Sequence, residues 1–135
     1  MSGDSDGLTQ INELLAAHPA QEKDCGDKRT QLRRDGDKLI ADVTLSGCER
    51  SYRFEVPVAK LVFDKLETEV TAEHGRGQVY ILCQNDESCA AWMIQDKPGA
   101  EWRKVRDDPE FVIDLAPDAD AVKKLQDLLT AWRGG

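Results

Sequence analysis

Four cysteines are the residues whose type and spacing say most about the chemistry of this chain. They are Cys25, Cys48, Cys83 and Cys89, and no two of them show the C-x2-C spacing typical of zinc ribbons. Cys83 and Cys89 bracket a polar turn between two strand-like runs, which suits a disulfide across a hairpin and leaves Cys25 to pair with Cys48. We therefore predict two disulfides, with four buried free thiols or a metal site as the alternatives.

The predicted disulfides indicate an oxidising compartment, so we expect a periplasmic or secreted protein. Residues 1–7 contain neither the basic stretch nor the apolar stretch of a signal peptide. We expect that a signal peptide was removed and an initiator Met added for expression, which makes residues 1–7 a disordered segment or an expression remnant. The alternative location is the cytoplasm.

Residues suited to catalysis are sparse. The two histidines are His18, before a proline at an expected helix end, and His74, in a glycine-flanked turn. Neither histidine neighbours a nucleophile pattern, and the G-x-S-x-G motif is absent. Acidic pairs such as Asp118 and Asp120 do not follow the spacing of a calcium loop. We predict that the protein is not an enzyme and has no catalytic residue, metal or cofactor.

The charge balance restricts the classes of partner. The 135 residues include 18 Lys and Arg against 26 Asp and Glu, a formal net charge of −8. Because phosphate contacts require an excess of basic residues, this balance argues against a nucleic-acid-binding protein. No apolar run approaches the length of a membrane span. An acidic surface favours a protein partner with a basic surface.

Two of the three tryptophans are candidates for partner contact. Trp132 falls on the apolar stripe of the last expected helix and is predicted to lie in the core. Trp102 lies between Glu101 and Arg103 in a charged segment, and Trp beside Arg is typical of protein contact hot spots. Trp92 lies in a strand-like run with two apolar faces. We therefore predict partner contacts at Trp102, Arg103 and Trp92.

Hydrophobic periodicity predicts the elements that must position these residues. Helical spacing of apolar residues predicts a short helix over 8–17 and a last amphipathic helix that starts at Asp118 and Asp120 and has an apolar stripe from Val122 to Trp132. Alternating patterns predict strands over 38–45, 51–58, 60–70, 78–83, 89–94 and 110–115. Residues 60–70 also fit a helical stripe, although the run from Thr68 to Thr71 favours a strand. Residues 20–37 and 95–109 are predicted to be turns and loops.

This order predicts a single α+β domain over residues 8–135. It comprises a short N-terminal helix, a five- or six-stranded antiparallel meander and a C-terminal amphipathic helix. A curled meander closed by a C-terminal helix resembles the pleckstrin-homology-like superfold, a resemblance of element order alone. Such a superfold does not determine a function.

The sequence favours a non-enzymatic, extracytoplasmic protein-interaction module with an acidic surface, for example an inhibitor or an immunity-type protein. Trp102 and the 95–109 loop are its predicted contact region. The first alternative is a domain that binds a small apolar ligand in a pocket lined by Trp92, Met93 and Phe111. The second alternative is a cytosolic thiol or zinc protein, which requires reduced cysteines.

Overall fold

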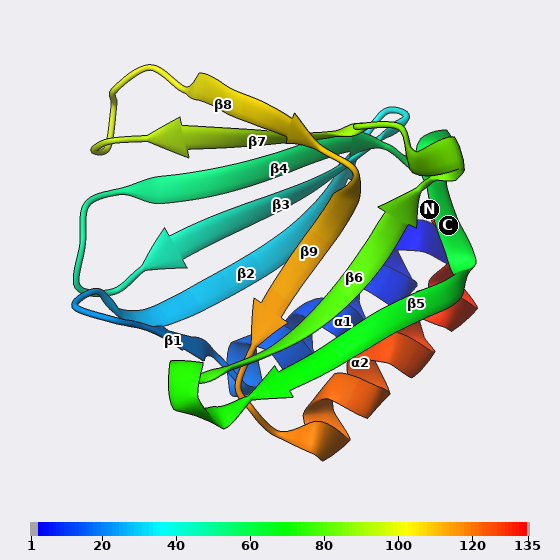
Figure 1. Cartoon of the computed structure of the whole chain (residues 1–135), viewed down its shortest axis with the longest axis horizontal. Helices are drawn as coiled ribbons and strands as arrows, with labels where there is room; N and C mark the ends of the chain where they lie inside the picture. Colours follow the sequence, from blue (N-terminus) through cyan, green and yellow to red (C-terminus); the bar gives the residue numbers. More distant parts are fainter. Residues whose placement is uncertain (1–2, 135) are drawn as a thin grey trace.

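The computed structural model describes residues 3–134, which form two α-helices and nine β-strands (Figure 1). Helix α1 spans Gly3–Ala17 and helix α2 spans Ala119–Trp132. The strands are β1 (Ala20–Glu22), β2 (Gly26–Asp35), β3 (Lys38–Leu45), β4 (Ser51–Pro57), β5 (Leu61–Thr71), β6 (Arg76–Cys83), β7 (Ala90–Gln95), β8 (Arg103–Asp108) and β9 (Glu110–Leu115). In this described part of the chain, neither helix has the length and apolar composition of a membrane span.

The strands form two antiparallel sheets, which we call the large sheet and the small sheet. The large sheet has six strands in the order β1-β2-β3-β4-β7-β8, and the small sheet has three in the order β5-β6-β9. Neither sheet closes on itself into a barrel. The arrangement confirms the predicted α+β class, with one helix before the strands and one after them (Figure 1).

The sheets contain more strands than the five or six predicted for one meander. Residues 20–37, predicted as turns, form β1 and β2, and the predicted 95–109 loop contains β8. Because β4 pairs with β7 and β6 pairs with β9, the strand order is also not that of a meander. Residues 60–70 lie largely in strand β5, as predicted. Helix α1 begins at Gly3, inside the segment expected to be disordered, and residues 1–2 lie outside the described ones.

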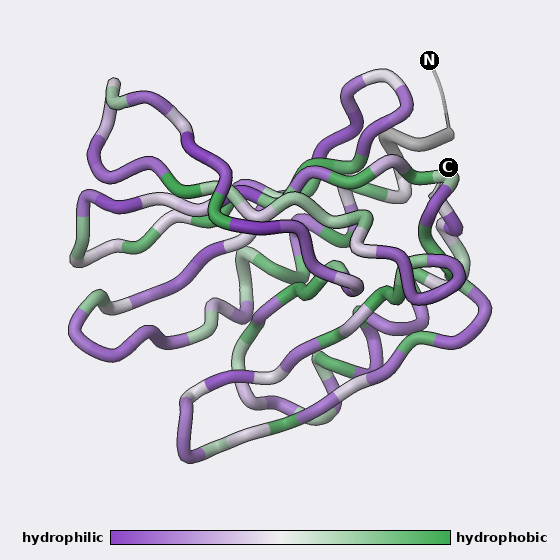
Figure 2. Tube along the Cα trace, turned by 45° about the horizontal axis from the view of Figure 1, so that its top comes forward, coloured by the Kyte–Doolittle hydropathy of each residue, from purple (hydrophilic) through white to green (hydrophobic). Residues whose placement is uncertain are grey.

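The core lies where the two helices meet the two sheets. Helix α1 packs against β2 and α2, while α2 packs against β5 and β6 (Figure 1). Figure 2 shows hydrophobic segments gathered in this interior, with hydrophilic segments at the outer hairpins. The fully buried side chains include Ile11, Leu15, Leu32, Leu39, Val56, Val79, Ile81, Phe111, Ile113, Leu115, Leu125 and Leu129. Trp132 also belongs to the core and packs edge-on against Phe63, as its helical position predicts.

The N-terminus of α2 is capped as its sequence indicates. The Asp118 side chain accepts hydrogen bonds from the backbone N–H groups of Asp120 and Ala121, at 3.0 and 3.2 Å. Asp120 lies in the first turn, where the helix dipole favours a negative charge. The two carboxylates that do not match a calcium loop therefore stabilise the start of a helix.

Asn12 of α1 binds the outer edge of strand β2. Its side-chain N–H donates to the Leu32 carbonyl at 2.9 Å, and the Leu32 N–H donates to its side-chain oxygen at 2.7 Å. Strand β1 pairs with β2 only as far as Lys28, so Leu32 has no strand neighbour on this side. The amide of Asn12 takes the position that a further strand would occupy and satisfies both backbone groups.

Both predicted disulfides are present, and the described residues contain no free cysteine. The Cys25–Cys48 bridge joins the start of β2 to the turn between β3 and β4, with the Cα atoms 5.1 Å apart. The Cys83–Cys89 bridge does not cross a hairpin, because β6 and β7 belong to different sheets. It therefore links the two sheets instead. With all four sulfurs bonded, no cysteine is left as a thiol or a zinc ligand.

A candidate binding cleft between the two sheets

A cleft of about 280 Å³ lies between one face of the large sheet and the facing side of the small sheet. Its walls combine aromatic, aliphatic and charged side chains from eight strands. The large sheet contributes Glu22, Lys28, Thr30, Val43, Tyr52, Phe54, Trp92 and Arg106, and the small sheet contributes Arg76, Gln78, Val112 and Asp114. The volume lies near the lower end of the range for small-molecule pockets.

Strand alternation and register place the aromatic residues on the cleft side of the large sheet. Tyr52 and Phe54 are two apart on β4, so they share a face. Phe54 is directly opposite Trp92 on β7, and Tyr52 is opposite Val43 on β3. Directly opposed residues on neighbouring strands lie on the same face of a sheet. The two neighbouring strands β4 and β7 therefore form one continuous aromatic wall, and Val43 on β3 adds an aliphatic side chain beside it.

Two arginines flank the aromatic rings of this wall. The Arg50 guanidinium carbon lies 5.4 Å from the Tyr52 ring centre, and that of Arg106 lies 4.5 Å from the Trp92 ring centre. The Tyr52 and Trp92 ring centres are 5.8 Å apart. Both cation–ring distances are within the range in which a ring attracts a cation. The four side chains form a row, which we call the Arg–aromatic row.

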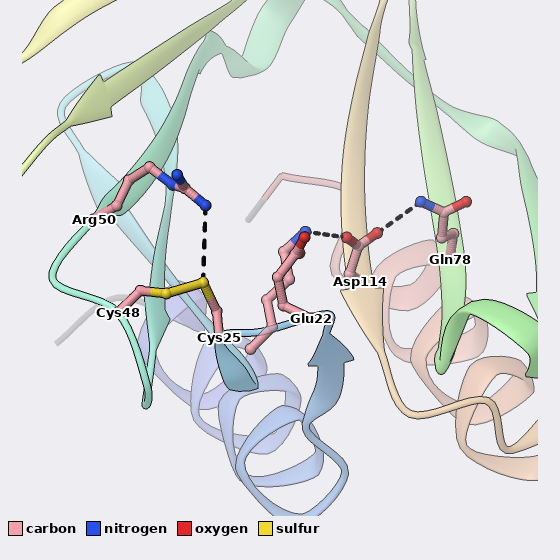
Figure 3. Close-up of polar contacts among 7 residues, drawn as sticks. Glu22, Cys25, Cys48, Arg50, Gln78 and Asp114 are labelled. Carbon is pink, nitrogen blue, oxygen red and sulfur yellow. Dashed lines mark hydrogen bonds and ion pairs between the residues drawn. A yellow bond between two sulfur atoms is a disulfide. The ribbon is translucent and has the colours of Figure 1, made fainter.

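The polar side of the cleft is built around the buried carboxylate of Asp114. The Asp114 side chain is 8% exposed and accepts hydrogen bonds from Lys28 Nζ and, at 2.8 Å, from Gln78 Nε2 (Figure 3). Lys28 Nζ also lies 3.8 Å from Glu22 Oε2. Because an unpaired buried charge is costly, these contacts hold β2 and β9 together across the two sheets.

Tyr80 extends this polar network on the small sheet. Its hydroxyl contacts the side-chain oxygen of Gln78 and lies 3.1 Å from a Glu69 carboxylate oxygen. Burial, together with the hydrogen bond to Glu69, raises the pKa of Tyr80 to about 12. Tyr80 therefore keeps its proton at neutral pH and cannot act there as a phenolate base.

Two polar groups of the cleft have no partner among the described residues. The Arg76 guanidinium makes no ion pair and no hydrogen bond, although it lies in the cleft wall. The Thr30 hydroxyl is buried and likewise has no hydrogen-bond partner. A buried polar group without a partner is unfavourable in the ligand-free protein. The Arg76 guanidinium, which is partly exposed, is therefore available to a bound molecule.

The predicted contact residues do not come together, because Trp92 and Trp102 lie on opposite faces of the large sheet. The Trp102 ring stacks on Arg53, whose guanidinium carbon is 4.2 Å from the ring centre. Arg53 alternates with Tyr52 and Phe54 along β4 and so points away from the cleft. Arg103 is exposed and lies 3.3 Å from Asp96 in the hairpin between β7 and β8.

Asp42 fixes the position of Arg53 on this outer face. Its two carboxylate oxygens accept hydrogen bonds from Arg53 at 2.7 Å and from Arg33 at 2.8 Å. Burial alone would raise the pKa of Asp42, but the hydrogen bonds from the two arginines outweigh it and lower the pKa below its usual value. Trp102 therefore rests on a cation that is held by an ionised carboxylate at neutral pH.

The pocket predicted from Trp92, Met93 and Phe111 is only partly correct in its lining. Trp92 lines the cleft. Met93 is directly opposite Arg53 and lies on the outer face of the large sheet. Phe111 is fully buried in the core, where its ring packs edge-on against Phe54 at 5.7 Å. Sequence periodicity alone does not show which of these three residues lies in the cleft, on the outer face or in the core.

Most of the polar cleft residues escaped the sequence analysis. Lys28 lies in a segment predicted as turns, and Arg76 lies in a glycine-rich turn sequence. Asp114 offered the one available signal, an acidic residue inside the otherwise apolar run 111–115.

In residues 3–134 the structure contains no group of three His, Cys, Asp or Glu side chains that could hold a metal ion. His18 instead faces Asp118 at 4.0 Å, near the start of α2.

Comparison with known proteins finds no matching family model, no matching curated protein and no matching solved structure. The strand order of the two sheets is not that of a single meander, so it does not carry the resemblance to the pleckstrin-homology-like superfold. The residues of the cleft and of the outer face are the basis for any functional proposal.

Proposed function

We propose that this protein is a non-enzymatic, extracytoplasmic binding protein that holds a small ligand in the cleft between its two sheets. The observation that carries the proposal is the aromatic wall of Tyr52, Phe54 and Trp92 beside the unpartnered Arg76 in one cleft. The extracytoplasmic location is supported by the two disulfides, because such bonds persist in oxidising compartments.

The cleft favours a small ligand over a protein segment. Its volume of about 280 Å³ suits a compound of one or two rings. Aromatic and aliphatic side chains next to well-placed polar groups are typical of small-molecule sites, and five of the twelve lining residues are aromatic or aliphatic. Lys28 and Gln78 already bind Asp114, so their donors hold the cleft together rather than serve a ligand. The aromatic wall is therefore the main surface for binding.

Replacing Trp92 should weaken the binding of a ring compound, because Trp92 is part of the cleft wall. We expect Trp92→Leu to weaken the binding of 2-naphthalenemethanol at least tenfold, measured by isothermal titration calorimetry. Trp102→Leu is the matched control, since Trp102 lies on the opposite face of the same sheet. The proposal is wrong if the wild-type protein binds no ring compound, or if both variants bind like the wild type.

The outer face of the large sheet supports a second function, that of a protein-interaction module. Trp102 is partly exposed on Arg53, and Arg103 is exposed beside it. Buried aromatic and arginine contacts dominate many protein interfaces. With a net charge of −8, the protein would attract a basic partner, as expected for an inhibitor or immunity-type protein.

Replacing Trp102 distinguishes this second function from ligand binding. A partner would first be isolated on immobilised protein from the extracytoplasmic fraction of the source cells. Trp102→Ala should then weaken its affinity at least tenfold in surface plasmon resonance, and added salt should slow association. Trp92→Leu serves as the control and should retain the partner. Unchanged affinity in Trp102→Ala would rule out this contact region.

A further inference from the structure

We propose that the ligand of the cleft is a small aromatic monoanion, a planar ring that carries one carboxylate. The carboxylate would bind Arg76, and the ring would lie against Tyr52 and Trp92. This inference rests on the proposed function, because it concerns the same cleft. It adds the charge and the shape of the ligand.

Arg76 supplies the argument for a negative charge. The other two cations of the cleft are already paired, since Lys28 binds Asp114 and Arg106 Nε donates to Asp108 at 2.8 Å. Arg76 has no such partner among the described residues. Its guanidinium can donate two parallel hydrogen bonds to a carboxylate, which is the geometry that arginine binds best. Because Arg76 is the one cation of the cleft lining without an acidic partner in residues 3–134, the ligand is expected to carry one anionic group.

The charges of the cleft also differ from those of the whole protein. Three cations, Lys28, Arg76 and Arg106, line the cleft with two carboxylates, Glu22 and Asp114. The lining residues thus carry a net charge of +1, obtained as 3 − 2, within a protein of net charge −8. Since Asp108, outside the lining, pairs with Arg106, the charge that remains unpaired in the described cleft is that of Arg76, and an anionic ligand would balance it.

The Arg–aromatic row supplies the argument for a planar ring. Tyr52 and Trp92 present their rings side by side, and Arg50 and Arg106 lie over them at the two ends. Aromatic rings pack on one another in offset or tilted geometries, with a gain beyond that of the buried area. A ring of the ligand would pack against the Tyr52 and Trp92 rings in the same way.

Four probes and one variant test the inference by isothermal titration calorimetry. The probes are 2-naphthoate, neutral 2-naphthalenemethanol, cationic 2-naphthylmethylamine and the non-aromatic anion cyclohexanecarboxylate. We expect 2-naphthoate to bind the wild-type protein at least tenfold more tightly than each of the other three. Arg76→Gln should reduce the affinity for 2-naphthoate to that for the alcohol, and leave the affinity for the alcohol unchanged.

Arg103→Gln is the matched control, because Arg103 is an exposed arginine away from the cleft, and it should bind all probes like the wild type. Thermal unfolding of Arg76→Gln should match that of the wild type, since the Arg76 side chain has no partner to lose. Equal binding of naphthoate and naphthalenemethanol would overturn the inference and leave the proposed function intact. Unchanged naphthoate binding in Arg76→Gln, or equal binding of cyclohexanecarboxylate, would also overturn it. The absence of binding by every ring compound would reject both.

Discussion

Replacing Lys28 by methionine is expected to destabilise the fold by about 3 kcal/mol, the low end of the range for breaking a buried ion pair. The change leaves the Asp114 carboxylate, which is 8% exposed, with Gln78 as its remaining hydrogen-bond donor. The low end applies because the Lys28 side chain is 15% exposed in the cleft and so retains some contact with water. Equilibrium unfolding in urea measures the loss.

A double variant separates the unpaired charge from the lost packing. Lys28→Met/Asp114→Asn removes both charges, while the asparagine oxygen can still accept from Gln78. It should recover most of the lost stability, because no buried charge remains. Lys123→Met is the control, since the Lys123–Asp127 pair is more than 60% exposed on both sides, and should change stability by less than about 0.5 kcal/mol. A loss below about 1 kcal/mol in Lys28→Met would contradict this interpretation of the pair.

Removing the Cys25–Cys48 bridge is expected to cost more stability than removing Cys83–Cys89. The sequence separations are 23 and 6 residues. Loop-closure entropy then gives about 3.4 kcal/mol for the first bridge and about 2.4 kcal/mol for the second. The first bridge also lies under Arg50, which donates a long hydrogen bond of 3.8 Å to Cys25 Sγ (Figure 3).

Paired alanine variants test this order by urea unfolding. Cys25→Ala/Cys48→Ala and Cys83→Ala/Cys89→Ala remove the same atoms, so each is the control for the other. If the Cys83–Cys89 variant is the less stable of the two, the link between the two sheets matters more than the length of the closed loop. That outcome would contradict the entropic account.

Side-chain patterns predicted the elements whose side chains are buried in a regular alternation. Residues 38–45 and 110–115 are rich in apolar residues that become buried, and they form β3 and β9 with these bounds. Strand β2 escaped prediction because Thr30 and Leu32 are its only two buried residues and the rest of the strand is polar. Strand β8 is an edge strand with exposed side chains, held by backbone hydrogen bonds to β7. A strand that is held only by backbone hydrogen bonds does not need alternating apolar residues, so hydrophobic periodicity does not detect it.

The cleft was predicted only through Trp92. Its polar residues, Lys28, Arg76 and Asp114, come from three strands in two sheets that are far apart in the sequence. Alternation along a strand shows which side chains share a face, but it does not show which strands pair. The pairing of β4 with β7 and of β6 with β9 therefore had to come from the structure. The disulfide pairs were correct, although the hairpin expected around Cys83 and Cys89 is absent.

The contact between Asn12 and Leu32 bears on whether copies of this chain associate. An open strand edge is a template for another strand, and copies of a protein can polymerise through such edges. Along β2 the template is occupied by the amide of Asn12, which belongs to a helix and so offers no further edge. The opposite edge, β8, carries charged side chains of both signs, the cations Arg103, Lys104 and Arg106 and the carboxylates Asp107 and Asp108. The large sheet ends in β1 on one side and β8 on the other, so the amide of Asn12 closes the part of β2 that the three-residue strand β1 leaves open, and the exposed charged side chains of β8 disfavour a further strand there.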